Sequence, residues 1–316
     1  MDSFEKPIVK KAIHILRIIV PVVLLGLLFF KVDFNTFISH LKTYPLELVL
    51  YASICIIIAN LLFAFRWKYI LNSIGISVTF FKLVRLVFFS LFLSNFLPSS
   101  VGGDLVKIVG ILNETDNAKK DLKVTSVFVD RVFSMASKIL LLPLAIPFLQ
   151  KNMNDISKVS EVGYLLFSFI PEKWTRRARN YVIAIKPWFS VKKITGILAL
   201  SWLSLFFTIT GYWLVAQPFG IPIRFDQVLC MSIITYFAII LPISINGYGV
   251  QEGSYIYLFT LLNFNYDQAW TIALIYRLIS IIISLLGGLW MLIDGRELFS
   301  LLRNQSEEVI IEPIVE

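Results

Sequence analysis

Two arginines lie inside otherwise apolar stretches of this chain. Arg131 follows Ser126-Val127-Phe128-Val129-Asp130, and Arg277 stands within Ala273-Leu274-Ile275-Tyr276-Arg277-Leu278-Ile279. In a membrane, an unpaired guanidinium costs from about 2.5 kcal/mol upward, so each arginine should face the protein interior and have a partner. A guanidinium also binds phosphate through two parallel hydrogen bonds. These positions therefore predict contact with an anionic group.

Each arginine comes after a break in an apolar run, at residues 96–104 and 240–252. Both breaks contain a proline, then glycines, then an acid: Pro98, Gly102, Gly103 and Asp104 in the first, and Pro242, Gly247, Gly249 and Glu252 in the second. Backbone outside a helix cannot face lipid, because its unpaired polar groups would cost several kcal/mol each. Glycines let a ligand approach the N–H groups at the start of the following half-helix.

The sequence thus predicts a substrate site formed by residues of both breaks and of the helices after them. The candidate binding residues are Arg131, Arg277, Asp104, Glu252, Gly102, Gly103, Gly247, Gly249 and Asp130, with Pro98 and Pro242 at the broken helices. A structural alternative stays open, in which Arg131 simply pairs with Asp104 or Asp130 and Arg277 with Glu252. In another open alternative, Asp104 and Glu252 carry protons during transport.

Composition predicts the elements that position these residues. Hydrophobic residues make up 57% of the 316 residues and charged residues 16%, and the mean hydropathy is +0.78. A soluble fold of this size could not bury so much apolar surface, so we expect an all-α polytopic membrane protein. The clearest predicted spans are residues 12–30, 46–65, 124–149, 194–216 and 269–293, and two more, 80–97 and 227–241, lead into the breaks.

The two halves of the chain resemble each other at their least common residues. Trp67, Gly75, Phe80, Pro98, Gly103 and Arg131 recur 144 to 146 residues later as Trp213, Gly220, Phe225, Pro242, Gly249 and Arg277. This register predicts repeats over about residues 61–141 and 205–286, within a single membrane domain at 1–300 that is followed by a short acidic tail at 301–316.

Basic residues predict the orientation, because cytoplasmic loops are enriched in Lys and Arg. With both termini cytoplasmic, the rule favours two re-entrant hairpins that enter from opposite faces, so that the repeats are inverted, as in transporters that open alternately to the two sides. The count is seven or eight membrane segments, because the apolar run at 162–170 is short for a span of roughly 20 residues.

Other features exclude several function classes. The basic stretch at 173–193 is typical of a segment at an anionic lipid surface, with tryptophans at headgroup depth, so we expect no nucleic-acid partner. His14 and His40 are isolated, and Cys55 and Cys230 cannot form a zinc site between them, so no metal is expected. No nucleotide-binding P-loop is present, and we expect no cofactor.

The motifs Pro98-x3-Gly102-Gly103-Asp104, Asp130-Arg131 and Pro242-x4-Gly247-x-Gly249-x2-Glu252 resemble the membrane domain of lysylphosphatidylglycerol synthases, a flippase-like family. The resemblance covers nearly the whole chain. It implies movement of an amphipathic lipid, with a separate lipid-modifying enzyme as a possible partner. About twenty residues follow the last predicted helix, so we expect a stand-alone member without the synthase domain.

We therefore expect a flippase or scramblase of the cytoplasmic membrane that moves an anionic or phosphate-linked lipid and is not an enzyme. Two alternatives stay open. One is a secondary transporter of a small soluble anion, and the other is a membrane-embedded lipid-phosphate transferase with Asp104 or Glu252 as base. The lipid, the direction, the coupling and the oligomeric state are not specified by the sequence.

Overall fold

The computed structural model describes residues 33–96, 102–113, 120–152, 186–188, 190–240 and 245–294. These segments form ten α-helices and three 3-10 helices, with no strand among them. The helices are α2 (Phe34–Thr43), α3 (Leu46–Asn72), α4 (Phe80–Ser94), α5 (Gly102–Asn113), α6 (Lys120–Ile139), α7 (Leu142–Asn152), α10 (Val191–Ala216), α11 (Phe225–Ile240), α12 (Val250–Thr260) and α13 (Tyr266–Asp294), with η1 (Lys186–Trp188), η2 (Gln217–Phe219) and η3 (Ile245–Gly247). The all-α prediction is confirmed.

Three of the described helices are long and apolar enough to cross a membrane: Leu46–Asn72, Val191–Phe219 and Tyr266–Ile293. A helix of 27 residues such as α3 is roughly 40 Å long, which exceeds the hydrocarbon thickness of about 30 Å. The apolar helix Phe225–Ile240 is shorter. This helix leads into the second break, so its length fits a segment that does not cross completely.

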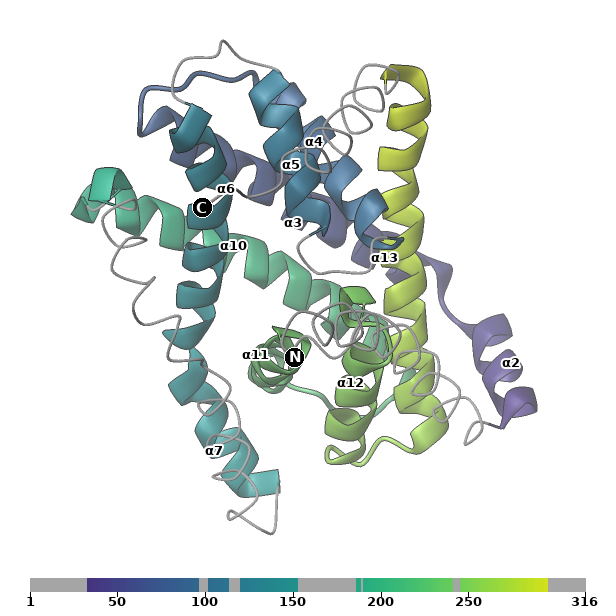
Figure 1. The fold of residues 1–316 in the computed structure, drawn as a ribbon. Helices are drawn as coiled ribbons and strands as arrows, with labels where there is room; N and C mark the ends of the chain where they lie inside the picture. Colours follow the sequence, from purple (N-terminus) through teal and green to yellow (C-terminus); the bar gives the residue numbers. More distant parts are fainter. Residues whose placement is uncertain are drawn as a thin grey trace, which may run out of the picture.

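The helices follow one another in the same order in both halves. A long helix (α3 or α10) precedes a shorter one (α4 or α11), a second short helix begins after the break (α5 or α12), and the helix with the interior arginine comes last (α6 or α13). The helices α3 and α10 pack along each other, and α13 packs against α4 (Figure 1). This order agrees with the predicted repeat. Its boundaries, the inversion and the re-entrant hairpins remain predictions.

Glycines let neighbouring helices approach closely around the first break. A Cβ atom at Gly103 of α5 would lie 2.2 Å from Ser94 Oγ and 2.7 Å from Ser90 Oγ of α4. A Cβ atom at Gly287 of α13 would lie 2.1 Å from the carbonyl oxygen of Phe88 on the same α4. The Phe88 carbonyl is part of the backbone, so the contact at Gly287 requires glycine, whereas at Gly103 the serine hydroxyls would have to rotate away.

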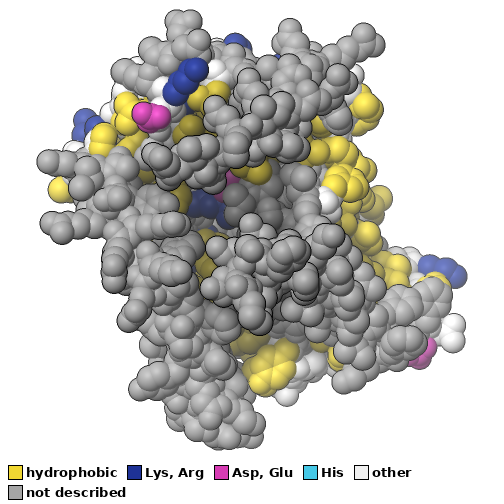
Figure 2. All heavy atoms as spheres, in the orientation of Figure 1, with side chains coloured by type: hydrophobic (Ala, Val, Ile, Leu, Met, Phe, Trp, Pro, Cys, Tyr) yellow, Lys and Arg dark blue, Asp and Glu magenta, His cyan; other side chains and the backbone are white. Residues whose placement is uncertain are grey.

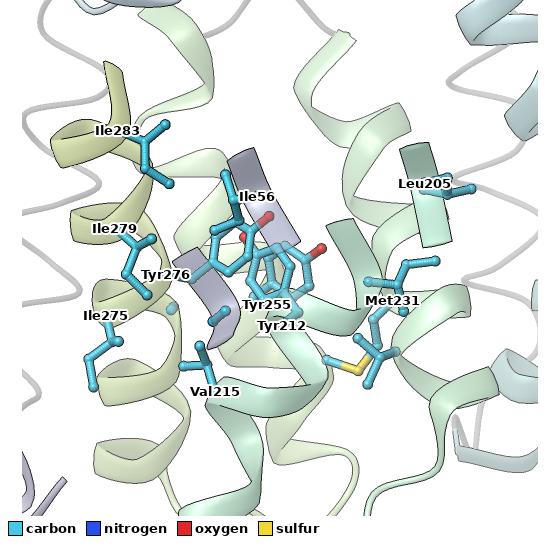
Figure 3. Packing of buried hydrophobic residues seen from close by; sticks show 14 of the residues in the cluster. Ile56, Leu205, Tyr212, Val215, Met231, Tyr255, Ile275, Tyr276, Ile279 and Ile283 are labelled. Carbon is cyan, nitrogen blue, oxygen red and sulfur yellow. The ribbon is translucent and has the colours of Figure 1, made fainter. Parts of the chain in front are cut away.

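Three tyrosines fill the centre of the second half. Tyr212 of α10 stacks on Tyr276 of α13 and on Tyr255 of α12, with ring centroids 3.3 Å and 4.0 Å apart (Figure 3). All three side chains are buried, and Ile56 of α3 borders them. The stack joins three helices of the second half and lies directly beside Arg277, which follows Tyr276.

Two predicted helix boundaries were wrong. The predicted span 124–149 is divided, because α6 ends at Ile139 and α7 begins at Leu142. In a continuous helix, the ring of Pro143 would clash with the carbonyl of Ile139, four residues earlier. The predicted span 46–65 ends too early, since α3 continues to Asn72 and carries Arg66 into the interior. The predicted span 12–30 and the run at 162–170 lie outside the described residues.

Candidate functional site

The second half holds an ion pair between Glu252 and Arg277. Glu252 lies in the first turn of α12, and its Oε1 accepts a hydrogen bond from Nε of Arg277 on α13. Its other oxygen accepts the backbone N–H of Gly249, at 2.7 Å. Both side chains are almost fully buried, at 10% exposure for Arg277 and 8% for Glu252. The carboxylate therefore caps its own helix and neutralises the arginine.

Further groups fix the Arg277 guanidinium in place. Its Nη2 donates to Gln251 Oε1 at 2.8 Å, and the amide of Gln251 donates in turn to the Tyr212 hydroxyl at 2.7 Å. The Tyr248 ring lies under the guanidinium, 4.6 Å from its centre, which is a favourable cation–π arrangement. The loop, α10, α12 and α13 thus all contribute to holding one positive charge.

The backbone of the second break adopts conformations that favour glycine. Gly247 and Gly249 have φ values of +74° and +78°, and Asn246 has a φ of +47°. These left-handed residues turn the chain into α12, so that the Gly249 N–H points at the Glu252 carboxylate. The glycines predicted from the sequence are therefore those that shape this turn.

The first half holds the corresponding pair, Arg131 and Asp104. Asp104 lies in the first turn of α5, and Nε of Arg131 on α6 forms an ion pair with its Oδ2. Here the two partners differ in burial, since the Arg131 side chain is 48% exposed and the Asp104 side chain only 13%. The first pair therefore presents an accessible guanidinium, whereas the second pair is enclosed.

Asp130 pairs with a residue that the sequence reasoning did not place in the site. Arg66 Nε of α3 lies 2.7 Å from Asp130 Oδ1, and Arg66 Nη1 donates to Ser201 Oγ of α10 at 3.0 Å. Arg66 is only 4% exposed. Since this pair joins α3, α6 and α10 inside the protein, Asp130 serves as the counter-ion of Arg66.

Two lysines lie near these acids. Lys107 of α5 interacts electrostatically with both Asp104 and Asp130. Lys138 of α6 interacts with the charge of Asp130, and its Nζ lies 4.1 Å from the centre of the Tyr236 ring of α11. With the two arginines and the two acids, they form what we call the first-half cluster: Arg66, Lys107, Arg131, Lys138, Asp104 and Asp130.

A set of amide and hydroxyl groups joins the two breaks. Asn95 follows α4 and leads into the first break, and its Oδ1 accepts hydrogen bonds from Asn246 Nδ2 at 3.0 Å and from the Tyr248 hydroxyl at 2.9 Å. Its own amide donates to Ser284 Oγ of α13 at 2.8 Å. Because Tyr248 also lies under Arg277, the start of the first break is connected to the arginine of the second half.

The structure brings the predicted site residues together as two separate pairs and one counter-ion. Pro98 and Pro242 lie outside the described residues, and only the backbone of Gly102 is described, as the first residue of α5. Sequence reasoning missed Arg66, Lys138, Gln251 and Asn95. A signal existed for Lys138, which lies two helical turns beyond Asp130 in an otherwise apolar predicted span. Another existed for Arg66, because its neighbour Trp67 corresponds in the repeat to Trp213, which is within a predicted helix.

The chemistry available to this arrangement is recognition of an anion. In the segments that the structure describes, no three His, Cys, Asp or Glu side chains gather as they would to hold a metal ion. The interior charges of the first-half cluster are mainly cationic, and one guanidinium is accessible. A phosphate or carboxylate could therefore bind there through charge-assisted hydrogen bonds.

Comparison with known proteins shows the family to which the chain belongs. The UPF0104 membrane protein MJ1595 of Methanocaldococcus jannaschii is 25% identical over 297 residues, which cover 82% of this chain and 88% of that protein. The UPF0104 membrane protein PH1989 of Pyrococcus horikoshii is 28% identical over 131 residues, which cover 41% of this chain and 39% of that protein. The family model described as "Lysylphosphatidylglycerol synthase TM region" matches residues 14–288. This multi-pass membrane protein therefore belongs to the lysylphosphatidylglycerol synthase transmembrane family, as a chain that consists mostly of that domain.

Proposed function

We propose that this protein is a lipid flippase or scramblase that moves an anionic or phosphate-linked lipid across the cytoplasmic membrane. The observation that carries the proposal is the recurrence of one arrangement in both halves. In each, an acid in the first turn after a break forms an ion pair with an arginine of the next long helix, as Asp104 does with Arg131 and Glu252 with Arg277. The family membership supports a lipid-related role.

The two pairs would act at different stages of transport. Arg131 is accessible, so it can bind a headgroup phosphate while Asp104 keeps it in place. Arg277 is enclosed and becomes available only if the elements around it move apart. Two similar halves that exchange these conformations would expose the headgroup alternately to the two sides while the lipid tails stay in the bilayer.

A second candidate is a secondary transporter of a small soluble anion, which could use the same guanidinium groups. A lipid-phosphate transferase is less well supported, because Asp104 and Glu252 are each engaged by an arginine and thus poorly suited to act as a base. We propose no catalytic role. Both termini are proposed to be cytoplasmic, and membrane lipids are the proposed partners.

The test is translocation of labelled phospholipid and labelled polyprenyl phosphate in proteoliposomes. Wild type is compared with Arg131→Leu, and Arg224→Leu is the control, because Arg224 precedes α11 and forms an exposed ion pair with Asp226 in the first turn of that helix. We expect translocation by wild type and by the control, and its loss in Arg131→Leu with the fold retained. Absence of lipid movement by folded wild type, together with uptake of a soluble anion, would favour the second candidate.

A further inference from the structure

The charges of the first-half cluster do not balance. Arg66 and Asp130 neutralise each other at 2.7 Å, and Arg131 and Asp104 form the second pair. Lys107 and Lys138 are the two cations that are left over. Neither forms an ion pair with a carboxylate in the part of the chain that the structure describes.

Lys138 has only neutral oxygens and a ring around its ammonium group in the described residues. Its Nζ donates to the carbonyl oxygen and to Oγ of Ser134, both at 3.2 Å, and lies over the face of Tyr236. It also interacts with the charges of Arg66 and Asp130, but these two already neutralise each other at 2.7 Å. In a low-dielectric interior, such an ammonium is stabilised by an additional anion.

Lys107 is the second remaining cation of the first-half cluster. It lies one turn after Asp104 on α5, so its ammonium is within reach of the acid that holds Arg131. The Trp67 ring lies 6.0 Å from its Nζ, at the limit of a cation–π contact. The two lysines therefore stand on α5 and α6, the helices that carry Asp104 and Arg131.

The fold itself does not require these two lysines. Lys107 lies three residues after Asp104, and the residue three after Glu252 is Tyr255. Lys138 lies seven residues after Arg131, and the residue seven after Arg277 is Ser284. The second half thus builds the same helices and the same acid–arginine pair with neutral residues at these positions. The excess of positive charge is specific to the first half.

The surface provides access to this region. Figure 2 shows basic side chains and an acidic one near the middle of one face, visible between residues drawn in grey. In the shared orientation, these charged side chains lie beside the crossing of α6 and α10 in Figure 1, the two helices that Asp130, Arg66 and Ser201 connect. The Arg131 side chain is 48% exposed, so this guanidinium is accessible.

We infer that the first-half cluster binds a headgroup with two negative charges, a phosphate monoester or a diphosphate, in preference to a singly charged or zwitterionic one. Lys107 and Lys138 supply the two positive charges that such a group balances, and Arg131 supplies the two-pronged phosphate contact. A phosphate monoester carries about −1.5 to −2 charges at pH 7, whereas a phosphodiester carries one. The inference rests on the proposed function, because it names the class of headgroup that would be moved.

The experiment compares three acyl-chain-labelled lipids in proteoliposomes: phosphatidic acid, phosphatidylglycerol and phosphatidylcholine. Uptake of labelled glycerol 3-phosphate is measured in parallel, because a soluble molecule could supply the same phosphate group. The variants are Lys107→Met and Lys138→Met. Lys193→Met is the matched control, since Lys193 also donates to neutral oxygens, the carbonyls of Ser73 and Pro187, but lies at the start of α10 away from the cluster.

We expect wild type and Lys193→Met to move phosphatidic acid roughly tenfold faster or more than phosphatidylglycerol, and each cluster variant to lose most of this preference. Equal rates for the three lipids with wild type would overturn the charge inference and leave the flippase proposal standing. Uptake of glycerol 3-phosphate that needs both lysines, with no lipid movement, would support the charge preference and refute the flippase proposal. If folded wild type moves none of the four, both fail.

Discussion

The side-chain amide of Asn246 donates a hydrogen bond to the side-chain oxygen of Asn95, 151 residues earlier in the chain. Asn95 follows α4 at the start of the first break, and Asn246 lies in the turn of the second break. The two broken regions are therefore in direct contact. Tyr248 adds a second link, because its hydroxyl donates a hydrogen bond to the same oxygen.

Replacing Asn95 with Ala should weaken this connection. The substitution removes the acceptor of two hydrogen bonds and the donor of a third, so we expect the free energy of unfolding to fall by about 1–3 kcal/mol. Denaturant unfolding of purified protein in detergent measures the change. Asn72→Ala is the control, because Asn72 is exposed at the end of α3. Equal stability of the two variants would show that the contact between the breaks contributes little.

The buried pair of Arg277 and Glu252 predicts a non-additive pair of substitutions. Arg277→Gln leaves the Glu252 carboxylate without its counter-ion in an apolar interior, and we expect a loss of about 3–5 kcal/mol in the free energy of unfolding. In the double variant with Glu252→Gln, the remaining amide can still accept the Gly249 N–H, so much of this loss should be recovered. Unfolding of the single and double variants tests the coupling. Additive losses would contradict it.

The contact between α13 and α4 predicts a strong effect of one methyl group. Gly287→Ala places a carbon against the Phe88 carbonyl, which cannot move aside as a flexible side chain could, so we expect a loss of about 1–3 kcal/mol. Gly211→Ala on α10 is the matched control, since its nearest neighbours would lie at 3.4 Å, in ordinary contact. Thermal unfolding in detergent should separate the two variants. A Gly287→Ala protein as stable as the control would contradict the tight packing.

The sequence predicted the helical elements and the acid–arginine pairs because both follow from local and compositional rules. Apolar length predicts α3, α10 and α13, and the cost of an interior guanidinium predicts partners for Arg131 and Arg277. The breaks were visible because Pro and Gly are rare in such runs. The sequence indicated Glu252 as the partner of Arg277 but left both Asp104 and Asp130 as candidates for Arg131.

The remaining contacts depend on tertiary packing that local patterns do not encode. The predicted span 46–65 ends just before Arg66, because a basic residue after an apolar run usually marks the end of a span. In the structure, Asp130 and Ser201 stabilise Arg66 inside the protein. For the same reason Asp130 could not be assigned from sequence, since it adjoins Arg131 but faces another helix. Asn95 and Gln251 belong to no motif in the sequence, and only the hydrogen bonds in the structure show their roles.

The central claim is that Arg131 binds substrate phosphate and does more than pair with Asp104. The most direct test is translocation of labelled phosphatidic acid and polyprenyl phosphate by wild type, Arg131→Leu and the double variant Arg131→Leu with Asp104→Asn, all checked for folding. The double variant has no unbalanced charge at this pair, so a purely structural pair would be replaced without loss of transport. We expect the double variant to be folded and inactive, like Arg131→Leu. Translocation by the double variant at the wild-type rate would contradict the account.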